Sequence, residues 1–326
     1  MNRQGNHFVK SICLIAGFVF SFNVWSEDPQ NIQIITLPTG SKAYRAGVTL
    51  AAAINRTTQH KAIVAGYGGA QVIVPMLQSN RAEFALINSD DATQGYRGTG
   101  QFRRSNDNLR LVSNAYDILA GVVVAQDSPI QSIADIKGKR VTGIFSSHKS
   151  CALIAQAQMA NLNLDRKDVR TVPVTNPISS VQAVAEGRAD VALCVSPGIP
   201  AALEANAKIG IRYLSMDPSA DALARQKNIF NASNIVLKNA GSVADISSDG
   251  YFLSYDYYLV GSTHVPDHVI EDVLTILWDQ HSSLSNENKD FMAWTQERMN
   301  FSDNLIPYHK AATKFFNSKG INFSDR

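Results

Sequence analysis

The sequence predicts an α/β protein with mostly parallel sheets, divided into two lobes with a ligand cleft between them. Strand and helix patterns alternate along the chain, and the alternation repeats after the middle. The strands end in polar or Gly-rich loops, which gather at one edge of such a sheet. The 300 residues that follow a predicted leader exceed what one core usually fills, which favours two lobes.

Residues 1–26 have the pattern of a secretory signal peptide. Arg3 and Lys10 form a basic leader with an apolar run at 12–22, and Ser26 ends a small-residue cleavage site. The apolar run is too short for a convincing membrane span. We therefore expect a cleaved leader and a soluble periplasmic product that starts near Glu27.

Removal of the leader leaves the chain electrically balanced. The whole chain has 30 Lys and Arg against 28 Asp and Glu, and two of the bases lie in the leader. A neutral protein lacks the basic surface that nucleic-acid-binding proteins need. We therefore expect no nucleic-acid partner.

In the first part of the chain, apolar strand patterns alternate with helix patterns. Strands are expected at 32–37, 62–65 and 84–87, and helices at 46–55 and 72–77. Gly68 and Gly69 break the chain after the second strand, and the polar residues 88–91 are expected to close the third strand as a loop.

The middle of the chain repeats this plan. Strands are expected at 140–144, 170–174 and 189–195, and helices at 151–161 and 179–186. The loop at 196–200 precedes another helix. Because ligands collect at the carboxyl ends of strands in open α/β sheets, these loops are expected to line one cleft.

Two extended segments, 119–125 and 255–260, lie on either side of the middle block. They predict a chain that crosses into a second lobe and returns, with helices between 269 and 316 packing back on the first lobe. Lobes joined in this way close on a ligand by a hinge motion. The predicted units are the leader 1–26, a first lobe made of 27–122 and 255–326, and a second lobe at 123–254.

Cys151 and Cys194 are the cysteines outside the leader. An oxidising compartment would join them in a disulfide if the geometry allows. Two separate buried thiols explain the same residues, so both alternatives stay open. Two cysteines cannot hold a structural zinc alone, and no H-E-x-x-H or C-x-x-C spacing supplies further ligands, so we expect neither metal nor cofactor.

Two hydroxyl-rich turns, 39–44 and 145–150, stand where strands give way to helices. The free N–H groups and positive dipole end of a helix start attract carboxylate or phosphate. Lys42 and Lys149 would add cations that face the cleft and favour an anionic ligand. The alternative is that both are solvated loop lysines, and that His148 is a surface histidine.

Short motifs follow one another in a characteristic order along nearly the whole chain after the leader. They are Thr39-Gly40 with Tyr44 and Gly47, residues 77–79 and 82–85, Asn88-Ser89-Asp90, the stretch 132–141, Pro197-Gly198-Ile199-Pro200, Val265-Pro266-Asp267, and Pro307-Tyr308-His309. In this order they resemble the TAXI group of solute-binding proteins, the receptors of TRAP (tripartite ATP-independent periplasmic) transporters. The stretch 132–141 occurs in variants across many periplasmic receptors, so it supports the fold and not the subgroup.

The resemblance implies a type II-like periplasmic-binding-protein fold with two hinge-crossing strands and no catalytic residues. Such a receptor captures a small organic anion, a carboxylate or dicarboxylate, and delivers it to an integral-membrane permease; we expect a monomer. A substrate-binding protein of an ABC importer and a periplasmic sensor are the alternatives. The turns and the resemblance together predict these ligand-binding residues: Gly40, Ser41, Lys42, Tyr44, Gly68, Gly69, Ser89, Ser147, His148, Lys149, Ser150, Pro197 and Gly198.

Several of these residues also have a structural explanation. The serines of the two turns suit helix N-caps, and Tyr44 could pack beneath its loop. The glycines and Pro197 give the backbone its shape. Tyr255 and Tyr257, on the return crossing, fit either ligand contact or burial in the hinge.

An enzyme is favoured less than a receptor. No Gly-x-Ser-x-Gly elbow surrounds Ser41 or Ser196, and no His takes a triad position. Cys151, at a helix start beside His148, is the sharpest nucleophile candidate, because a helix start lowers the pKa of a thiol. Pairing with Cys194 or simple burial explains the same residue, so we expect no enzymatic activity.

Overall fold

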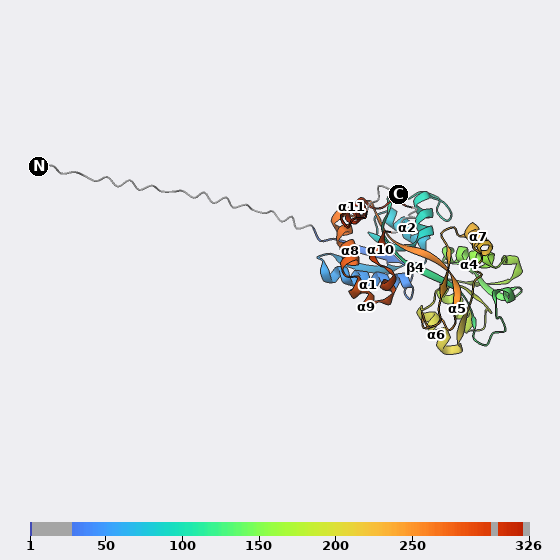
Figure 1. Cartoon of the computed structure of the whole chain (residues 1–326). Helices are drawn as coiled ribbons and strands as arrows, with labels where there is room; N and C mark the ends of the chain where they lie inside the picture. The colour runs from blue at the N-terminus through green and yellow to red at the C-terminus, as the bar shows by residue number, and fades with distance from the viewer. Residues whose placement is uncertain (2–27, 301–305, 322–326) are drawn as a thin grey trace.

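Two α/β lobes lie side by side, and the chain crosses between them (Figure 1). The computed structural model describes Met1, residues 28–300 and residues 306–321. The predicted leader therefore lies, apart from Met1, outside the described residues. The division of an α/β chain into two lobes is confirmed, whereas the boundaries proposed at 122/123 and 254/255 stay predictions.

The first lobe is built on parallel strands whose two faces are covered by different helices. Its elements are β1 (Asn31–Thr36), α1 (Lys42–Thr57), β2 (Lys61–Gly66), α2 (Ala70–Gln78), β3 (Phe84–Asn88) and α3 (Ser89–Arg97). Successive residues of a strand face opposite sides, so Ile34 belongs to the core under α1 and Ile35 to the core under α2. These layers fix the ends of β1 and β3, where the loops toward the second lobe begin.

The second lobe contains a smaller parallel pair of strands and several helices. Its elements are β5 (Arg140–Phe145), α4 (Lys149–Asn161), β6 (Arg170–Val174), α5 (Pro177–Ala185), β7 (Ala192–Val195), α6 (Pro200–Ile209), β8 (Ile211–Leu214), α7 (Ala220–Ile229) and β9 (Asn234–Lys238), with 3-10 turns η1 (Ile133–Ile136) and η2 (Arg166–Asp168). β5 and β6 pair in parallel, and β7 and β8 join the larger sheet through the first crossing strand.

Two long strands, β4 (Leu109–Ala125) and β10 (Gly250–Ser262), connect the lobes. They pair with each other antiparallel, and β10 pairs with β3 at one end and with β9 at the other. β4 likewise reaches β7 and β8 at its far end. The two predicted crossing segments lie inside these strands, so the hinge-crossing topology is confirmed.

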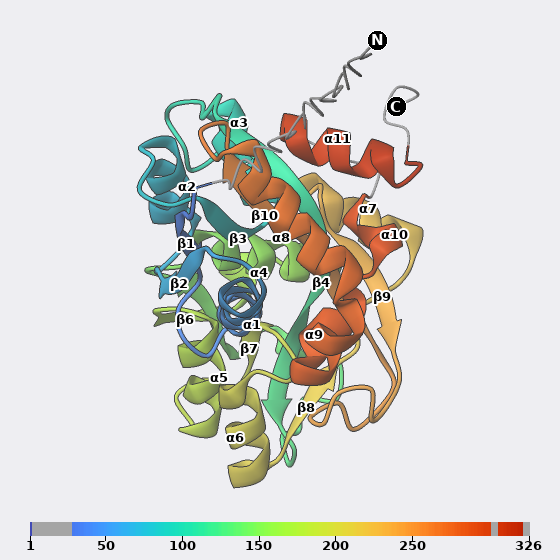
Figure 2. The same cartoon turned by 90° about the vertical axis from the view of Figure 1, so that its left-hand side faces the viewer.

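The C-terminal part returns to the first lobe as helices, as predicted. These are α8 (Asp267–Asp279), α9 (His281–Glu287), η3 (Lys289–Ala293), α10 (Gln296–Met299) and α11 (Lys310–Ser318). α8 packs beside α1 and α11, and Figure 2 shows it crossing the front of the molecule in that view. The loop between α9 and α10 brings Trp294 against β4, where its indole N–H donates to Ser113 Oγ at 2.9 Å.

The main differences from the predicted elements lie at helix starts. α1 starts at Lys42, four residues before the predicted position, because Ser41 Oγ accepts the N–H of Tyr44 at 3.1 Å. The predicted loop at 88–91 is wrong: Asn88 caps α3 by accepting the N–H of Asp91, so Ser89 begins a helix. β8, α7 and β9 were not expected from the sequence.

Candidate functional site

A small pocket lies between the lobes and is lined by both of them and by both crossing strands. Its walls are mostly apolar, and none of the described residues that line it is acidic. They are Leu37, Pro38, Gly40, Ser41, Lys42, Ala43, Ile118, His148, Cys151, Asn176, Pro177, Ile178, Cys194, Ser196, Ile199, Tyr255 and Tyr257. The space has a volume of about 60 Å³.

The N-termini of α1, α4, α5 and α6 converge on this pocket. Side chains cap three of them, and the caps of α1 and α5 are Ser41 and Asn176, which accept the N–H of the third helical residue. The N–H groups of Lys42, Ala43 and Ile178 precede the first intrahelical hydrogen bonds and stay available to a ligand. Several positive helix ends around one pocket favour an anion.

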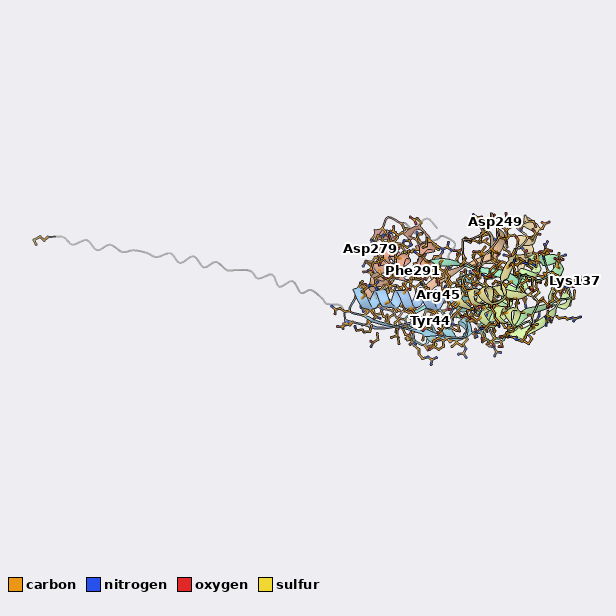
Figure 3. The ribbon with its side chains drawn as sticks, turned by 90° about the horizontal axis from the view of Figure 1, so that it is seen from below. Tyr44, Arg45, Lys137, Asp249, Asp279 and Phe291 are labelled. Carbon is orange, nitrogen blue, oxygen red and sulfur yellow. A yellow bond between two sulfur atoms is a disulfide. The ribbon has the colours of Figure 1, made fainter. Side chains whose placement is uncertain are left out.

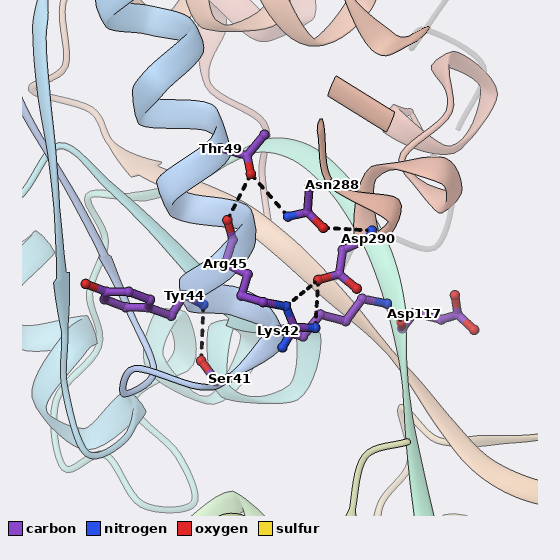
Figure 4. Close-up of polar contacts among 8 residues, drawn as sticks. All are labelled: Ser41, Lys42, Tyr44, Arg45, Thr49, Asp117, Asn288 and Asp290. Atoms are coloured by element: carbon purple, nitrogen blue, oxygen red, sulfur yellow. Dashed lines mark hydrogen bonds and ion pairs between the residues drawn. The ribbon is translucent and has the colours of Figure 1, made fainter. Parts of the chain in front are cut away.

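Lys42 supplies the ammonium group of the pocket. Its Nζ donates to the backbone oxygen of Asp117 on β4 at 3.2 Å (Figure 4). The same Nζ lies 4.6 Å from the centre of the Tyr116 ring. It forms no salt bridge within the described residues. Burial lowers the pKa of Lys42, and the carboxylates of Asp290 and Asp117 oppose that shift. A bound anion would therefore meet an ammonium that no carboxylate neutralises by direct contact.

Two tyrosines of β10 form another wall. Tyr255 and Tyr257 line the pocket, with ring centres 6.1 Å apart, and Tyr257 stacks on Tyr116 at 5.8 Å. Burial raises the pKa of both phenols, so each remains a neutral O–H donor. Of the two explanations given from the sequence, hinge burial and pocket contact, the structure combines both.

His148 and a disulfide close the floor of the pocket. Cys151 and Cys194 are joined, which decides between the two alternatives left open for these residues. A sulfur in a disulfide is not a thiolate, so this geometry gives Cys151 no nucleophilic role. The His148 ring is buried, and burial lowers its pKa to about 4. Its Nδ1 accepts the N–H of Cys151 at 3.2 Å, which leaves Nε2 as the protonated nitrogen of a neutral ring.

A wider outer chamber adjoins the pocket and shares Lys42, Ile118 and Ser196 with it. Its volume is about 840 Å³. The charged residues that line it are Lys42, Arg45, Lys238, Lys289 and Asp290. Asp290 pairs with Arg45 at 2.9 Å, as Figure 4 shows, so three lysines keep uncompensated charge. Arg45 lies near the middle of the molecule, between the ends marked by Asp279 and Lys137 (Figure 3).

The structure brings only part of the predicted ligand set together. Gly40, Ser41, Lys42 and His148 line the pocket, so the surface-histidine alternative is wrong for His148. Pro197 and Gly198 line the outer chamber instead. The remaining predicted residues line neither space: Tyr44, Gly68, Gly69, Ser89, Ser147, Lys149 and Ser150.

Tyr44 is absent from the pocket because of helical rotation. It lies two residues after Lys42 in α1, and at about 100° per residue the two side chains point to opposite sides of the helix. Figure 4 shows the Tyr44 ring directed away from Lys42. The prediction that Tyr44 contacts the ligand therefore lacks support from the structure.

The other outlying residues have structural positions. Lys149 is exposed and lines neither space, so it is not the second cleft-facing cation that we predicted beside Lys42. Ser89 is buried in the first turn of α3, where its backbone oxygen accepts from Thr93 Oγ1. Ser147 Oγ donates to the backbone oxygen of Thr175, and Ser150 Oγ donates to Asp91. Hydroxyl-rich composition alone did not separate these serines from pocket residues.

The start of α5 and Ile118 on β4 were not among the predicted ligand-binding residues. Asn176 followed by Pro177 after a strand is a helix-start signature, so this helix start at the pocket could have been found in the sequence. Ile118 on β4 carries no comparable signal, and it belongs to the pocket only because β4 pairs with β7 in the sheet. Ser196 lies in the loop 196–200, which was expected to line the cleft.

Within residues 28–300 and 306–321, no cluster of three or more His, Cys, Asp or Glu side chains is arranged to hold a metal ion. No helix in the same part of the chain is long and apolar enough to cross a membrane.

Known proteins that are similar to this chain support the fold described above. The NMT1-like family matches residues 34–320. PhnD1 from Prochlorococcus marinus, solved with methylphosphonate, is 11% identical with a TM-score of 0.52, over 90% of this chain and 99% of that one. A binding protein component of an ABC phosphonate transporter from Pseudomonas aeruginosa is 13% identical with a TM-score of 0.52, over 82% and 80%.

A third similar structure, described as a periplasmic transporter, is 11% identical with a TM-score of 0.55, over 89% of this chain and 92% of that one. At such identities the likeness shows the fold alone. The chain has the two-lobed periplasmic-binding-protein fold.

Proposed function

The chain belongs to the NMT1-like family, and from that membership and the pocket we propose that it is an extracytoplasmic solute receptor for a small organic anion. The carrying observation is the convergence of four helix N-termini and the Lys42 ammonium on one pocket whose described lining residues include no acid. The hinge-crossing strands let the lobes open for the ligand and close around it.

The pocket walls restrict the ligand further. The anionic group would lie near Lys42 and the first-turn N–H groups of α1 and α5, and the neutral donors of Tyr255 and Tyr257 would face it. The apolar side chains, such as Ile118 and Ile178, would surround a short hydrocarbon part. We propose a small carboxylate or phosphonate, because either group accepts several hydrogen bonds in so small a space.

We infer the cellular compartment from the predicted leader and the disulfide. A Cys151–Cys194 bond persists in an oxidising environment such as the periplasm. We propose that the protein acts there after removal of its predicted signal peptide, as a receptor and not as an enzyme.

A membrane permease is the proposed partner, and an ABC importer supports it better than a TRAP transporter. An ABC phosphonate binding protein has this fold, which favours the alternative named from the sequence. The order of the motifs keeps the TRAP permease, and with it the TAXI subgroup, as the second candidate. An ATPase gene adjacent to the gene of this chain would favour the ABC importer, and a large permease gene without an ATPase would favour TRAP.

Calorimetry of the purified protein with small carboxylates, phosphonates and their neutral amides tests the receptor function. We expect one site per chain and a Kd of about 10 µM or tighter for at least one anion, a free energy of about 7 kcal/mol. The matching amide should bind at least about tenfold more weakly, because it cannot use the Lys42 charge. Tighter binding of the amides than of the anions would refute an anion receptor.

The outer chamber should speed up the capture of anions. Replacing both Lys238 and Lys289 with Gln removes two of its three uncompensated charges, so we expect association with the anion to slow by about 3- to 10-fold at low salt. The dissociation rate should stay the same. Stopped-flow binding at rising ionic strength measures this, and the difference from wild type should vanish at high salt. The matched control is Lys137→Gln at the far end of the second lobe, where an equal slowing would contradict local steering.

A further inference from the structure

The second hydroxyl-rich turn docks on the first lobe beside the pocket. Ser150, in the first turn of α4, donates from Oγ to Oδ2 of Asp91 in α3 at 2.6 Å. The exposed fractions are 7% for Ser150 and 4% for Asp91. This hydrogen bond therefore joins the two lobes in a dry contact that the ligand-binding residues do not use.

The first lobe holds the Asp91 carboxylate ready for this contact. Asn88 Nδ2 donates to Oδ2 at 2.5 Å, and Gln101 Nε2 donates to Oδ1 at 2.6 Å. Asp91 has no salt bridge with a base within the described residues. Burial raises the pKa of Asp91 to about 7, and the three donors oppose that shift by stabilising the ionised form. Of the three, only Ser150 comes from the other lobe.

A second hydrogen bond lies on the same face. Gln71 in α2 donates from Nε2 to the backbone oxygen of Ser147 at 3.0 Å, so the first lobe contacts the turn at Ser147 and at Ser150. The same turn carries His148, which lines the pocket. Docking of this turn on the first lobe therefore also places His148 in the wall of the pocket.

We propose that Asp91 and Ser150, with Gln71 and Ser147 beside them, form an interlobe latch that stabilises the closed state and sets how long the ligand remains bound. The inference rests on the proposed receptor function. Opening of the hinge separates the latch, so its strength enters the ligand affinity through the population of the closed state. Asp91 and Ser150 act as positioning residues, because neither lines the pocket.

The test is Ser150→Ala, measured by stopped-flow binding of the best anion. A hydrogen bond to a charged group, lost between lobes, should speed up dissociation by about 10- to 100-fold and leave association within about twofold. Ser150→Thr keeps the hydroxyl and should restore slow dissociation. An unchanged dissociation rate in Ser150→Ala would overturn the latch.

The matched control is Ser180→Ala, which also removes a buried serine hydroxyl. Ser180 Oγ donates to the backbone oxygen of Leu193, within the second lobe, and contacts Thr142 Oγ1. This variant should lower the thermal stability of the protein and leave the ligand dissociation rate unchanged. Faster dissociation in Ser180→Ala as well would mean that general destabilisation, and not the latch, explains the effect.

A second readout does not depend on the ligand. Fluorophores on cysteines introduced by Lys137→Cys and Asp279→Cys, which Figure 3 shows toward opposite ends, report the distance between the lobes by energy transfer. Without ligand, Ser150→Ala should shift the population toward a more open distance, and no shift would count against the latch. If no anion binds to the wild type, the receptor function fails while this measurement still decides the latch.

Discussion

Replacing Lys42 with Met should weaken binding of the anionic ligand by about 30- to 1000-fold, while the protein stays folded. Met keeps the length and apolar body of the side chain and removes the ammonium that faces the pocket. Loss of one partner of a buried charge pair costs about 2–4 kcal/mol, much of which reflects the other charge left unpaired. Calorimetry measures the loss in affinity, and thermal unfolding checks that the fold is retained.

The control for this variant is Lys61→Met, which removes the same charge from the exposed start of β2. It should bind the anion with an affinity within about twofold of wild type.

The pH dependence of anion affinity is a second signature of Lys42. Because burial lowers the pKa of Lys42, the ammonium is lost below the usual pH for a lysine, and anion affinity should fall as pH rises through that range. An alkaline loss that persists in Lys42→Met would assign it to another group.

The local sequence pattern was sufficient to predict the strands and the two segments that cross between the lobes. β1 was predicted within one residue at each end, because an apolar run bounded by polar turns depends only on neighbours in the chain. The crossing segments were found for the same reason. They proved longer than predicted, because β4 and β10 gain further residues from pairing with each other, which periodicity alone does not reveal.

The predicted ligand-binding residues line the pocket only where their role followed from a position at a helix start. Ser41 and Lys42 belong to the pocket because the turn after β1 ends at the cleft. The direction of the Tyr44 side chain depends on its angular position around α1, and the start of this helix was predicted four residues too late. Ser147 and Ser150 have the same composition signal as Ser41, yet they contact the first lobe. Which loop faces which lobe is a property of tertiary packing, so similar turns acquired different roles.

Removing the disulfide should cause the largest loss of stability expected here. Cys151 and Cys194 are separated by 43 residues, and closing a loop of this length in the unfolded chain accounts for about 4 kcal/mol. We expect the double variant Cys151→Ala with Cys194→Ala to unfold at a lower urea concentration than wild type. Wild type that has been denatured, reduced and refolded should unfold at the same lowered concentration as the double variant. Far-UV circular dichroism follows this transition.

The location of the bond gives this experiment its control. The bond ties the start of α4 to the end of β7, both in the second lobe, whereas Trp278 and Trp294 lie in the C-terminal helical segment that packs on the first lobe. Tryptophan fluorescence should therefore shift less than circular dichroism, and reductant should not change the double variant at all. Equal unfolding midpoints of oxidised and reduced wild type would show that the cross-link does not stabilise the protein. A large stability loss with unchanged anion affinity would show that the bond supports the lobe and not the pocket. Because both cysteines line the pocket, we expect the affinity to fall as well.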